Sequence, residues 1–532
     1  DGSALAGSAS FEAENLQINA DGYKEGGGVY VNEGKIILHT ATIRAKGYGI
    51  ALRGASATDS VTVNGALTLT SECTTGIYIT GGSLTLNGEA NIISSIDAAY
   101  TFVSGAPGTV SYDGVFVEGG SLTANTAAFN VTHEGVANDD QNASNNGNYL
   151  YREFVIKSYA VRVTQKDTKA PVVEIASGTI SNTIGGGIYV SGGTVTLGAE
   201  ESKTGPTVTT TGTALQGNVL NAEGNSSSNW QYKQSLTGGH AIEVEGGTLT
   251  VCGGTYTADQ GNGILVRNLS GATLNNSVIV YGGTFYGYNK GYTGGKTGPA
   301  ASAGLYIMGN TVTVEIYGGE FGDSDATSAN NGATFFGTQP LTGSSQKRAQ
   351  VTVYSANFGG YNSDAISVFR YVDIDFGSEG KTGSIIVDKK GSGVALSVQD
   401  DQVFTGNSDR GSVINIYGTE DTVRFISNSN RSIYYGCTYD YLNFYGGYFG
   451  AGNTEYAVDF NSAPYTRSGW WPNYQYSYTV KLYGGTFVGG GNRNAFGSGN
   501  NISFDMDMLI DQNSQFKDGI SNGNTVVVEP KN

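Results

Sequence analysis

Cysteine, proline and histidine are scarce in this chain: its 532 residues include three cysteines, eight prolines and three histidines. Cys73, Cys252 and Cys437 lie far apart, which excludes a disulfide framework and a CxxC metal motif. The few prolines, beside 82 glycines and no Gly-X-Y triplet, exclude a collagen-like chain. The 34 tyrosines and 21 phenylalanines exclude a disordered glycine-rich polymer.

Basic residues and long apolar runs are also lacking. Lysine and arginine number 29 against 46 acidic residues, and the formal net charge is −17. Nucleic acid is therefore not an expected partner. No apolar run approaches the length of a transmembrane helix, so no membrane span is predicted. The chain begins at Asp1 rather than methionine, which fits a secreted protein whose signal peptide has been removed.

A repeated unit of three short strands joined by glycine corners is present instead. The clearest copy spans residues 76–93, and apolar residues alternate within its strands as expected for half-buried strands. Gly81-Gly82 permits a sharp corner, because glycine accepts positive φ without a Cβ clash. A single coil leaves its inner face and backbone groups unsatisfied, so copies must stack on one another.

The copies of this unit cover most of the chain. First strands recur at residues 29–31, 50–52, 77–79, 115–117, 161–163, 188–190, 242–244, 264–266, 305–307, 366–368, 394–396 and, more weakly, 457–459. A Tyr-Gly-Gly-x-Phe element recurs at residues 281–285, 317–321, 445–449 and 483–487. The pattern predicts an all-β fold, a single β-solenoid of roughly fifteen coils. Its predicted inward residues include Ile77, Ile79, Leu84, Leu86, Val195, Leu197, Leu249 and Val251.

The repeat also predicts the domain organisation. Residues 1–28 form an N-terminal cap or assembly segment, and glycines there favour an extended chain over a helix. Residues 29–532 form the solenoid, whose corners tolerate long loops because the cost of loop closure grows slowly with length. Surface-loop insertions are predicted at about residues 138–148, 200–233, 286–301, 323–348 and 465–478.

This pattern resembles the right-handed parallel β-helix family, the pectate-lyase-like solenoids that also occur in bacterial surface proteins and phage tailspikes. The resemblance implies a secreted or cell-surface bacterial protein, but the fold carries lyases, hydrolases and adhesins. Polygalacturonase-like members would have paired aspartates, a Gly-His-Gly and an Arg-x-Lys. This chain has Gly238-Gly239-His240 instead, and its Asp400-Asp401 pair has no histidine nearby in sequence. No catalytic residue is predicted, and enzymatic activity is not favoured.

Two Asp-x-Asp pairs, Asp373 with Asp375 and Asp505 with Asp507, are the candidate metal ligands. Alternate residues of a strand share a face, which would place the two carboxylates of each pair ~6.5–7 Å apart. Such a pair can bind Ca²⁺ or act as an acid/base couple. The favoured interpretation is an outward face with solvated carboxylates, and no cofactor other than calcium is considered.

Aromatic residues supply the candidate binding surface. Those at the middle of first strands face outward and would align in a stripe, which either stabilises coil stacking or binds sugar rings or a partner protein. A second aromatic group, in the segment 465–478, either contacts a glycan or protein or packs on the solenoid flank. The stripe comprises Tyr30, Tyr78, Phe116, Tyr189 and Tyr306, and the second group comprises Trp470, Trp471, Tyr474 and Tyr476.

The ends of a solenoid expose unpaired backbone groups, as the edges of any sheet do. Phe11, Leu16 and Ile18, together with residues 526–528 (Val526, Val527 and Val528), are therefore expected to mediate end-to-end self-association. The leading hypothesis is a non-enzymatic extracellular protein, a surface adhesin or a filament subunit. The alternative is a carbohydrate-active β-helix enzyme or a tailspike-like glycan-binding protein, and a passive glycan-binding module is a third possibility.

Overall fold

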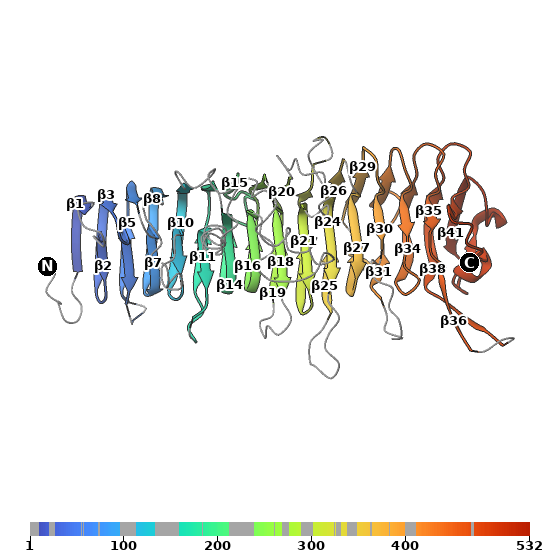
Figure 1. Cartoon of the computed structure of the whole chain (residues 1–532), viewed down its shortest axis with the longest axis horizontal. Coiled ribbons are helices and arrows are strands. Elements are labelled where there is room, and N and C mark those ends of the chain that lie inside the picture. The colour runs from blue at the N-terminus through green and yellow to red at the C-terminus, as the bar shows by residue number, and fades with distance from the viewer. Residues whose placement is uncertain are drawn as a thin grey trace, which may run out of the picture. The chain divides into compact units, whose positions relative to one another are not determined.

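The computed structural model describes residues 10–20, 27–54, 56, 58–72, 75–95, 113–132, 159–166, 168–183, 185–211, 239–259, 261–268, 276–288, 302–323, 325, 331–337, 348–361, 364–381, 383–399, 411–469 and 473–531. The chain divides into two compact units. The first unit comprises residues 1–265 and 288–301, and the second comprises residues 266–287 and 302–532. Both are built almost entirely from short parallel β-strands, which follow one another in chain order within each unit (Figure 1).

The first unit contains three parallel ladders, because each coil contributes up to three strands. The first ladder joins β2 (Val29–Val31), β4 (Ile50–Arg53), β7 (Ile77–Gly81), β9 (Val115–Val117), β11 (Tyr159–Thr164), β14 (Gly186–Leu197) and β16 (Ile242–Val251). The second ladder joins β1 (Ser10–Ala20), β3 (Lys35–Ala45), β5 (Ser60–Val63), β8 (Ser83–Ser95), β10 (Ser121–Thr132) and β12 (Val172–Ile175) to the later halves of β14 and β16. The third ladder joins the later halves of β1, β3, β8 and β10 to β6 (Leu67–Ser71), β13 (Gly178–Asn182), β15 (Thr207–Thr210) and β17 (Thr255–Ala258).

The second unit repeats the three-ladder arrangement, and β18 (Ile264–Asn268) spans the sequence boundary between the units. Its first ladder joins β21 (Ala303–Gly309), β24 (Asn331–Gly337), β27 (Ile366–Arg370), β30 (Leu396–Val398), β33 (Ile433–Tyr435), β35 (Val458–Phe460) and β39 (Phe496–Gly497). The second ladder joins β19 (Asn276–Val280), β22 (Val312–Ile316), β25 (Ala349–Val353), β28 (Val372–Phe376), β31 (Val413–Ile416), β34 (Tyr441–Gly450) and β38 (Val480–Val488). The third ladder joins β20 (Thr284–Gly287), β23 (Glu320–Phe321), β26 (Ala356–Gly360), β29 (Ile385–Lys389) and β32 (Val423–Ser427) to the later halves of β34 and β38.

These ladders confirm the predicted all-β solenoid and the extended N-terminal segment, where β1 pairs in parallel with β3. Three predicted loop insertions contain strands. Residues 200–233 include β15, residues 323–348 include β24, and residues 465–478 include the antiparallel hairpin of β36 (Tyr465–Ser468) and β37 (Gln475–Tyr478). The predicted insertion at residues 138–148 lies outside the described residues.

The core lies between the ladders of each unit, and it consists of apolar residues stacked in register. Val195 pairs in register with Leu249, and Leu197 with Val251, as expected when equivalent positions of successive coils lie above one another. All eight residues predicted to point inward are buried, each at most 1% exposed. Because every coil depends on its neighbours to cover its apolar residues, stability in such a stack is a sum of nearest-neighbour interfaces.

The Tyr-Gly-Gly-x-Phe elements form the corner between the second and third ladders of the second unit. The second glycine of each element has positive φ, between 102° and 127° at Gly283, Gly319, Gly447 and Gly485, which a side chain would strain. The phenylalanine that follows is buried and stacks on its counterparts, for example Phe285 on Phe321 at 4.8 Å between ring centroids. The tyrosine before the corner lies outside the core. Each element therefore places its phenylalanine ring in the core and its tyrosine ring on the outer face.

The second unit closes with antiparallel strands rather than another parallel coil. β41 (Thr525–Pro530) pairs antiparallel with β38 and with β40 (Ser514–Phe516). The helical turns α3 (Met506–Leu509) and η2 (Lys517–Gly519) precede it. The prediction of a strand at residues 505–507 is therefore wrong: Asp505 is the N-cap of α3, and its carboxylate accepts a hydrogen bond from the backbone N–H of Asp507.

Candidate functional site

The predicted aromatic stripe exists on the first ladder of the first unit. Strand register places Tyr30, Ala51, Tyr78, Phe116, Arg162, Tyr189 and Glu243 in one outward column. Tyr48, two residues before β4, stacks on Tyr78 at 4.9 Å, and Tyr78 lies 5.5 Å from Phe116. Tyr30 is 46% exposed, whereas Tyr306 in the second unit is only 6% exposed and so is not on the surface as predicted.

Carboxylates bind the hydroxyl groups of this stripe from the adjacent coils. The Tyr78 hydroxyl donates to Glu118 at 2.5 Å, and the Tyr189 hydroxyl donates to Glu245. Burial first, and these carboxylates second, raise the pKa of Tyr78 and Tyr189 well above the usual range of a phenol. The hydroxyls therefore stay protonated donors at neutral pH, and each one links two coils.

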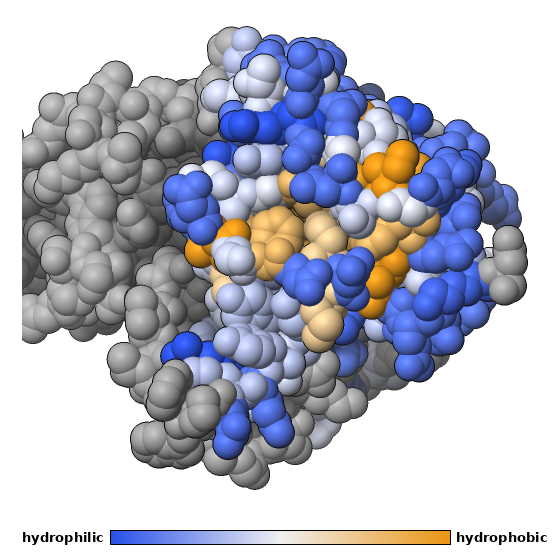
Figure 2. Space-filling model, turned by 90° about the vertical axis from the view of Figure 1, so that its right-hand side faces the viewer, coloured by the Kyte–Doolittle hydropathy of each residue, from blue (hydrophilic) through white to orange (hydrophobic). Residues whose placement is uncertain are grey.

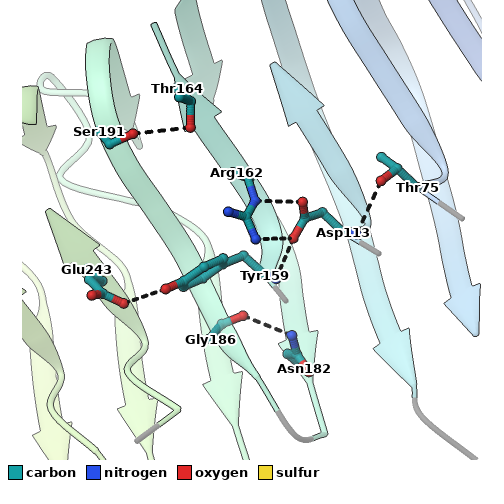
Figure 3. Close-up of polar contacts among 9 residues, drawn as sticks. All are labelled: Thr75, Asp113, Tyr159, Arg162, Thr164, Asn182, Gly186, Ser191 and Glu243. Atoms are coloured by element: carbon teal, nitrogen blue, oxygen red, sulfur yellow. Dashed lines mark hydrogen bonds and ion pairs between the residues drawn. The ribbon is translucent and has the colours of Figure 1, made fainter. Parts of the chain in front are cut away.

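A buried ion pair lies at the centre of the stripe (Figure 3). The Arg162 guanidinium donates to both carboxylate oxygens of Asp113, at 2.7 and 3.2 Å. Asp113 also accepts the backbone N–H of Tyr159 at 2.7 Å, and its own N–H donates to Thr75. The Asp113 side chain is fully buried, while that of Arg162 is 23% exposed. The bidentate pair joins the coils of Asp113 and Arg162, and the bond to Thr75 adds the preceding coil.

Aromatic rings enclose the same guanidinium. The carbon at its centre lies 4.9 Å from the ring centroid of Tyr159 and 5.6 Å from that of Tyr189, and these two rings stack at 4.7 Å. The Tyr159 hydroxyl donates to Glu243 at 2.6 Å, as Figure 3 shows. Cation–π contacts in a desolvated site are worth about 2 kcal/mol. The ring faces and hydroxyls near Arg162 thus make contacts within the unit.

A hollow of about 270 Å³ on the outer face of the second unit was not predicted from the sequence. It lies over the third ladder, where Gly322 and Gly359 occupy the register positions between Tyr286 and Asp388. Neither glycine contributes a side chain to the lining, and at Gly322 the backbone of Gly332 and Gly359 occupies the place that a Cβ would take. Glu320, Asp323, Asp325, Asn357, Phe358 and Ile386 complete the lining.

The hollow is acidic, and two aromatic residues, Tyr286 and Phe358, belong to its lining. Burial, followed by Glu320 and Asp323, raises the pKa of the Tyr286 phenol. Lys390 approaches from outside and pairs with Asp325 at 2.7 Å. A ring beside hydrogen-bonding carboxylate and amide groups is the chemistry that fits a hydroxyl-rich or amino-bearing ligand. The signal in the sequence is a glycine at equivalent positions of two successive third strands.

The predicted calcium ligands have partners within the chain. Asp373 and Asp375 lie on β28 as expected, where Asp373 pairs with Arg348 at 3.5 Å and Asp375 accepts from the Asn415 amide at 2.8 Å. Asp505 and Asp507 lie at the start of α3. Among the described residues, no group of three or more histidine, cysteine or carboxylate side chains is arranged to hold a metal ion. Calcium binding stays a prediction.

The second aromatic group lies on the hairpin of β36 and β37, while Trp470 and Trp471 fall outside the described residues. Tyr476 is 51% exposed, and its ring contacts that of Tyr465 edge-on at 5.2 Å. Arg467 lies over the Tyr474 ring at 4.2 Å. The described part of the hairpin therefore carries an exposed aromatic and cationic surface.

The predicted assembly residues differ in exposure. In β1, Phe11 is 52% exposed, and Leu16 and Ile18 are half-buried. The equivalent positions two coils later are buried: Val61 for Phe11, Leu67 for Leu16 and Leu69 for Ile18. Val526 and Val528 are buried in their own unit, and Val527 is half-buried. Figure 2 shows an apolar patch amid hydrophilic residues on the face that it draws. Among the closing elements, Met508 in α3 and Ile520 directly after η2 are each 49% exposed.

None of the helices described is long and apolar enough to cross a membrane. Comparison with protein-family models, with curated proteins and with solved structures finds no match to this chain.

Proposed function

We propose that this chain is a non-enzymatic extracellular protein of the bacterial β-solenoid type, acting as a surface adhesin or as the subunit of an extracellular filament. The proposal rests on one observation: polar and aromatic side chains that point away from the core link one coil to the next. The resemblance to right-handed parallel β-helix proteins supports the same assignment. The acidic composition, with a net charge of −17, favours a soluble exterior.

These links recur on separate faces of the units. Side-chain amides connect Asn87 to Asn64 at 3.0 Å and Asn125 to Asn87 at 3.4 Å. In the second unit, Asn443 donates to Asn415 at 2.8 Å in the same way. Groups that bind one another across coils strengthen the stack, whereas catalytic groups must converge on a substrate. Side chains of this kind therefore support a structural role.

Self-association is the second part of the proposal. Among the described residues, β1 pairs only with β3, so its other edge presents backbone donors and acceptors. Each backbone hydrogen bond to a neighbouring subunit would contribute only ~0.5–1.5 kcal/mol. Burial of Phe11, Leu16 and Ile18 would contribute more, and a heterologous contact of this kind propagates when the rotation does not close.

Electron microscopy and sedimentation of the purified chain over a range of concentrations test this part. Intact chain is expected to polymerise, and Phe11→Ser is expected to weaken polymerisation. Val172→Ser is the matched control, because Val172 is also exposed, at 41%, but lies on the interior strand β12. Deleting residues 1–20 should abolish polymers while leaving the circular dichroism of a folded β-protein. A chain that stays monomeric at high concentration, or a truncated one that still polymerises, contradicts the model.

The hollow beside Tyr286 favours a second candidate, a glycan-binding or carbohydrate-active β-helix protein. A panel of soluble polysaccharides, assayed for binding and for release of reducing or unsaturated ends, separates the candidates. Binding lost in Tyr286→Ala without turnover would support a glycan-binding module. Turnover lost in Asp388→Asn would replace the structural proposal with an enzymatic one. Tyr439→Ala is the control, because Tyr439 is 46% exposed and does not line the hollow.

A further inference from the structure

Tyrosines form a column along the corner that follows the second ladder of the second unit. Seven positions of this ladder are in register: Val280, Ile316, Val353, Phe376, Ile416, Phe444 and Leu482. The residues that follow them are Tyr281, Tyr317, Tyr354, Gly377, Tyr417, Tyr445 and Tyr483. Gly377 is the single interruption. It divides the column into two groups of three, which we call the first triad (Tyr281, Tyr317, Tyr354) and the second triad (Tyr417, Tyr445, Tyr483).

Rings within each triad stack face to face. In the second triad, the Tyr445 ring centroid lies 4.4 Å from those of Tyr417 and Tyr483, with interplanar angles of 6° and 9°. In the first triad the separations are 5.3 and 4.7 Å, with angles of 21° and 14°. Parallel strands direct equivalent side chains the same way, so like atoms of adjacent rings lie above one another.

The phenol groups of the triads are accessible and lie close together. The central rings are partly exposed, Tyr317 at 41% and Tyr445 at 38%. In the second triad, burial, followed by the neighbouring Tyr417, raises the pKa of the Tyr445 phenol. In the first triad, the Tyr317 hydroxyl donates to Glu315 at 3.0 Å, so a base is available for the phenolic proton. Close ring carbons, solvent access and a route for the proton favour oxidative coupling of adjacent phenols.

We propose that the two triads are sites of covalent modification, in which a one-electron oxidant joins tyrosines of adjacent coils as dityrosine. Each of two stacked phenols loses one electron to the oxidant and one proton to a base, giving two neutral phenoxyl radicals. The radicals form a carbon–carbon bond between ring positions ortho to the oxygens. The two hydrogens on those carbons then move to the phenol oxygens, which restores both aromatic rings. The net change is the loss of two hydrogens, with two oxidant equivalents reduced.

A stack of three tyrosines around an exposed central ring distinguishes the triads from the other described tyrosines; Tyr48 and Tyr78 also stack, at 4.9 Å, but as a single pair of half-buried rings. Tyr159 and Tyr189 also stack, at 4.7 Å, but Tyr159 is only 6% exposed. Tyr439 is 46% exposed but has no stacked ring among the described residues. Coupling within a triad would join coils covalently, which goes beyond the proposed structural or adhesive function and does not depend on it.

Photo-oxidation of the full chain at low concentration tests the proposal, with a ruthenium tris(bipyridyl) complex and persulfate as the one-electron oxidant. Dityrosine fluorescence reports coupling, and mass spectrometry of peptides identifies the linked residues by the loss of two hydrogens. Links within the two triads are expected. Tyr445→Phe should eliminate the 417–445 and 445–483 links and leave those of the first triad, and Tyr317→Phe should do the reverse. Phenylalanine keeps the stacked ring, and circular dichroism checks that each variant is folded.

Three results would overturn the inference. One is linkage through Tyr439 at a yield equal to that of the triads, which would mean that exposure alone decides reactivity. Another is oxidation of Tyr445 without any linked peptide, which would mean that the stacked rings do not couple. An unchanged link pattern in Tyr445→Phe would likewise contradict it.

Discussion

Replacing Arg162 by methionine would leave the fully buried carboxylate of Asp113 without its cation. Asp113 keeps the Tyr159 N–H as a donor, at 2.7 Å, but loses two guanidinium hydrogen bonds. Breaking a buried ion pair from one side costs about 3–5 kcal/mol, because an uncompensated charge stays in the interior. We therefore expect Arg162→Met to lower the free energy of unfolding of the first unit by about 3–5 kcal/mol at pH 7.

The opposite substitution should be milder. In Asp113→Asn the remaining cation is 23% exposed, so water can reach it, and it keeps its contacts with the rings of Tyr159 and Tyr189. The asparagine carbonyl can still accept from the Tyr159 N–H. A loss of about 1–3 kcal/mol is expected, typical of a charged hydrogen bond. The double variant should therefore be more stable than Arg162→Met alone.

Urea denaturation followed by circular dichroism measures these differences in the free energy of unfolding. Equal losses in the two single variants, or a loss below about 1 kcal/mol in Arg162→Met, would place the pair among screened surface ion pairs and refute the reasoning.

Three further predictions follow from the buried residues and the aspartate pairs. Lys389 is buried, and burial lowers its pKa to about 8, so between pH 8 and about 10.4 the unfolded chain binds more protons than the folded one. Over that range the free energy of unfolding of the wild type, relative to that of Lys389→Met, should rise by up to about 3 kcal/mol. Urea titrations at several pH values measure this difference, and a difference that does not change with pH would contradict the prediction. Leu249→Asp should lower the free energy of unfolding by more than about 4 kcal/mol, because an unpaired charge enters the core. Thr250→Asp, on the opposite face of the same strand, is the control and should be tolerated. A thermal transition that Leu249→Asp leaves unchanged would disprove the inward position of Leu249. Chelating calcium should leave Tm unchanged, because Arg348 and Asn415 already face Asp373 and Asp375; a calcium-dependent rise in Tm that Asp375→Asn removes would establish a site instead.

The core and the strand order could be predicted because alternation within short strands is a local property of the sequence. Ile77, Ile79, Leu249 and Val251 are buried as the alternation requires. First strands of weaker pattern were missed, such as residues 333–335 in β24, whose sequence Ala-Thr-Phe has a small residue at one inward position. Burial of the alanine depends on the neighbouring coils, which a single strand does not reveal.

The contacts of the candidate sites could not be predicted, because they join residues brought together only by register. Asp113 and Arg162 are separated by 49 residues, and Tyr159 and Glu243 by 84. Neither pair belongs to a motif, and the number of residues between successive coils varies. The Asp-x-Asp pattern at residues 505–507 failed for the opposite reason, because a local N-cap bond stabilises a helical turn where the alternation suggested a strand.

Columns of equivalent side chains give a criterion for locating function in these units. Where a column is continuous, as for Tyr417, Tyr445 and Tyr483, each member is held by its neighbours and contributes first to stacking. Where a column is interrupted by glycine, no side chain stands between the flanking residues. Gly322 and Gly359 interrupt the column between Tyr286 and Asp388, and the hollow lies there. A ligand that contacts these units should therefore be sought first at interruptions, and mutations there should affect binding more than stability.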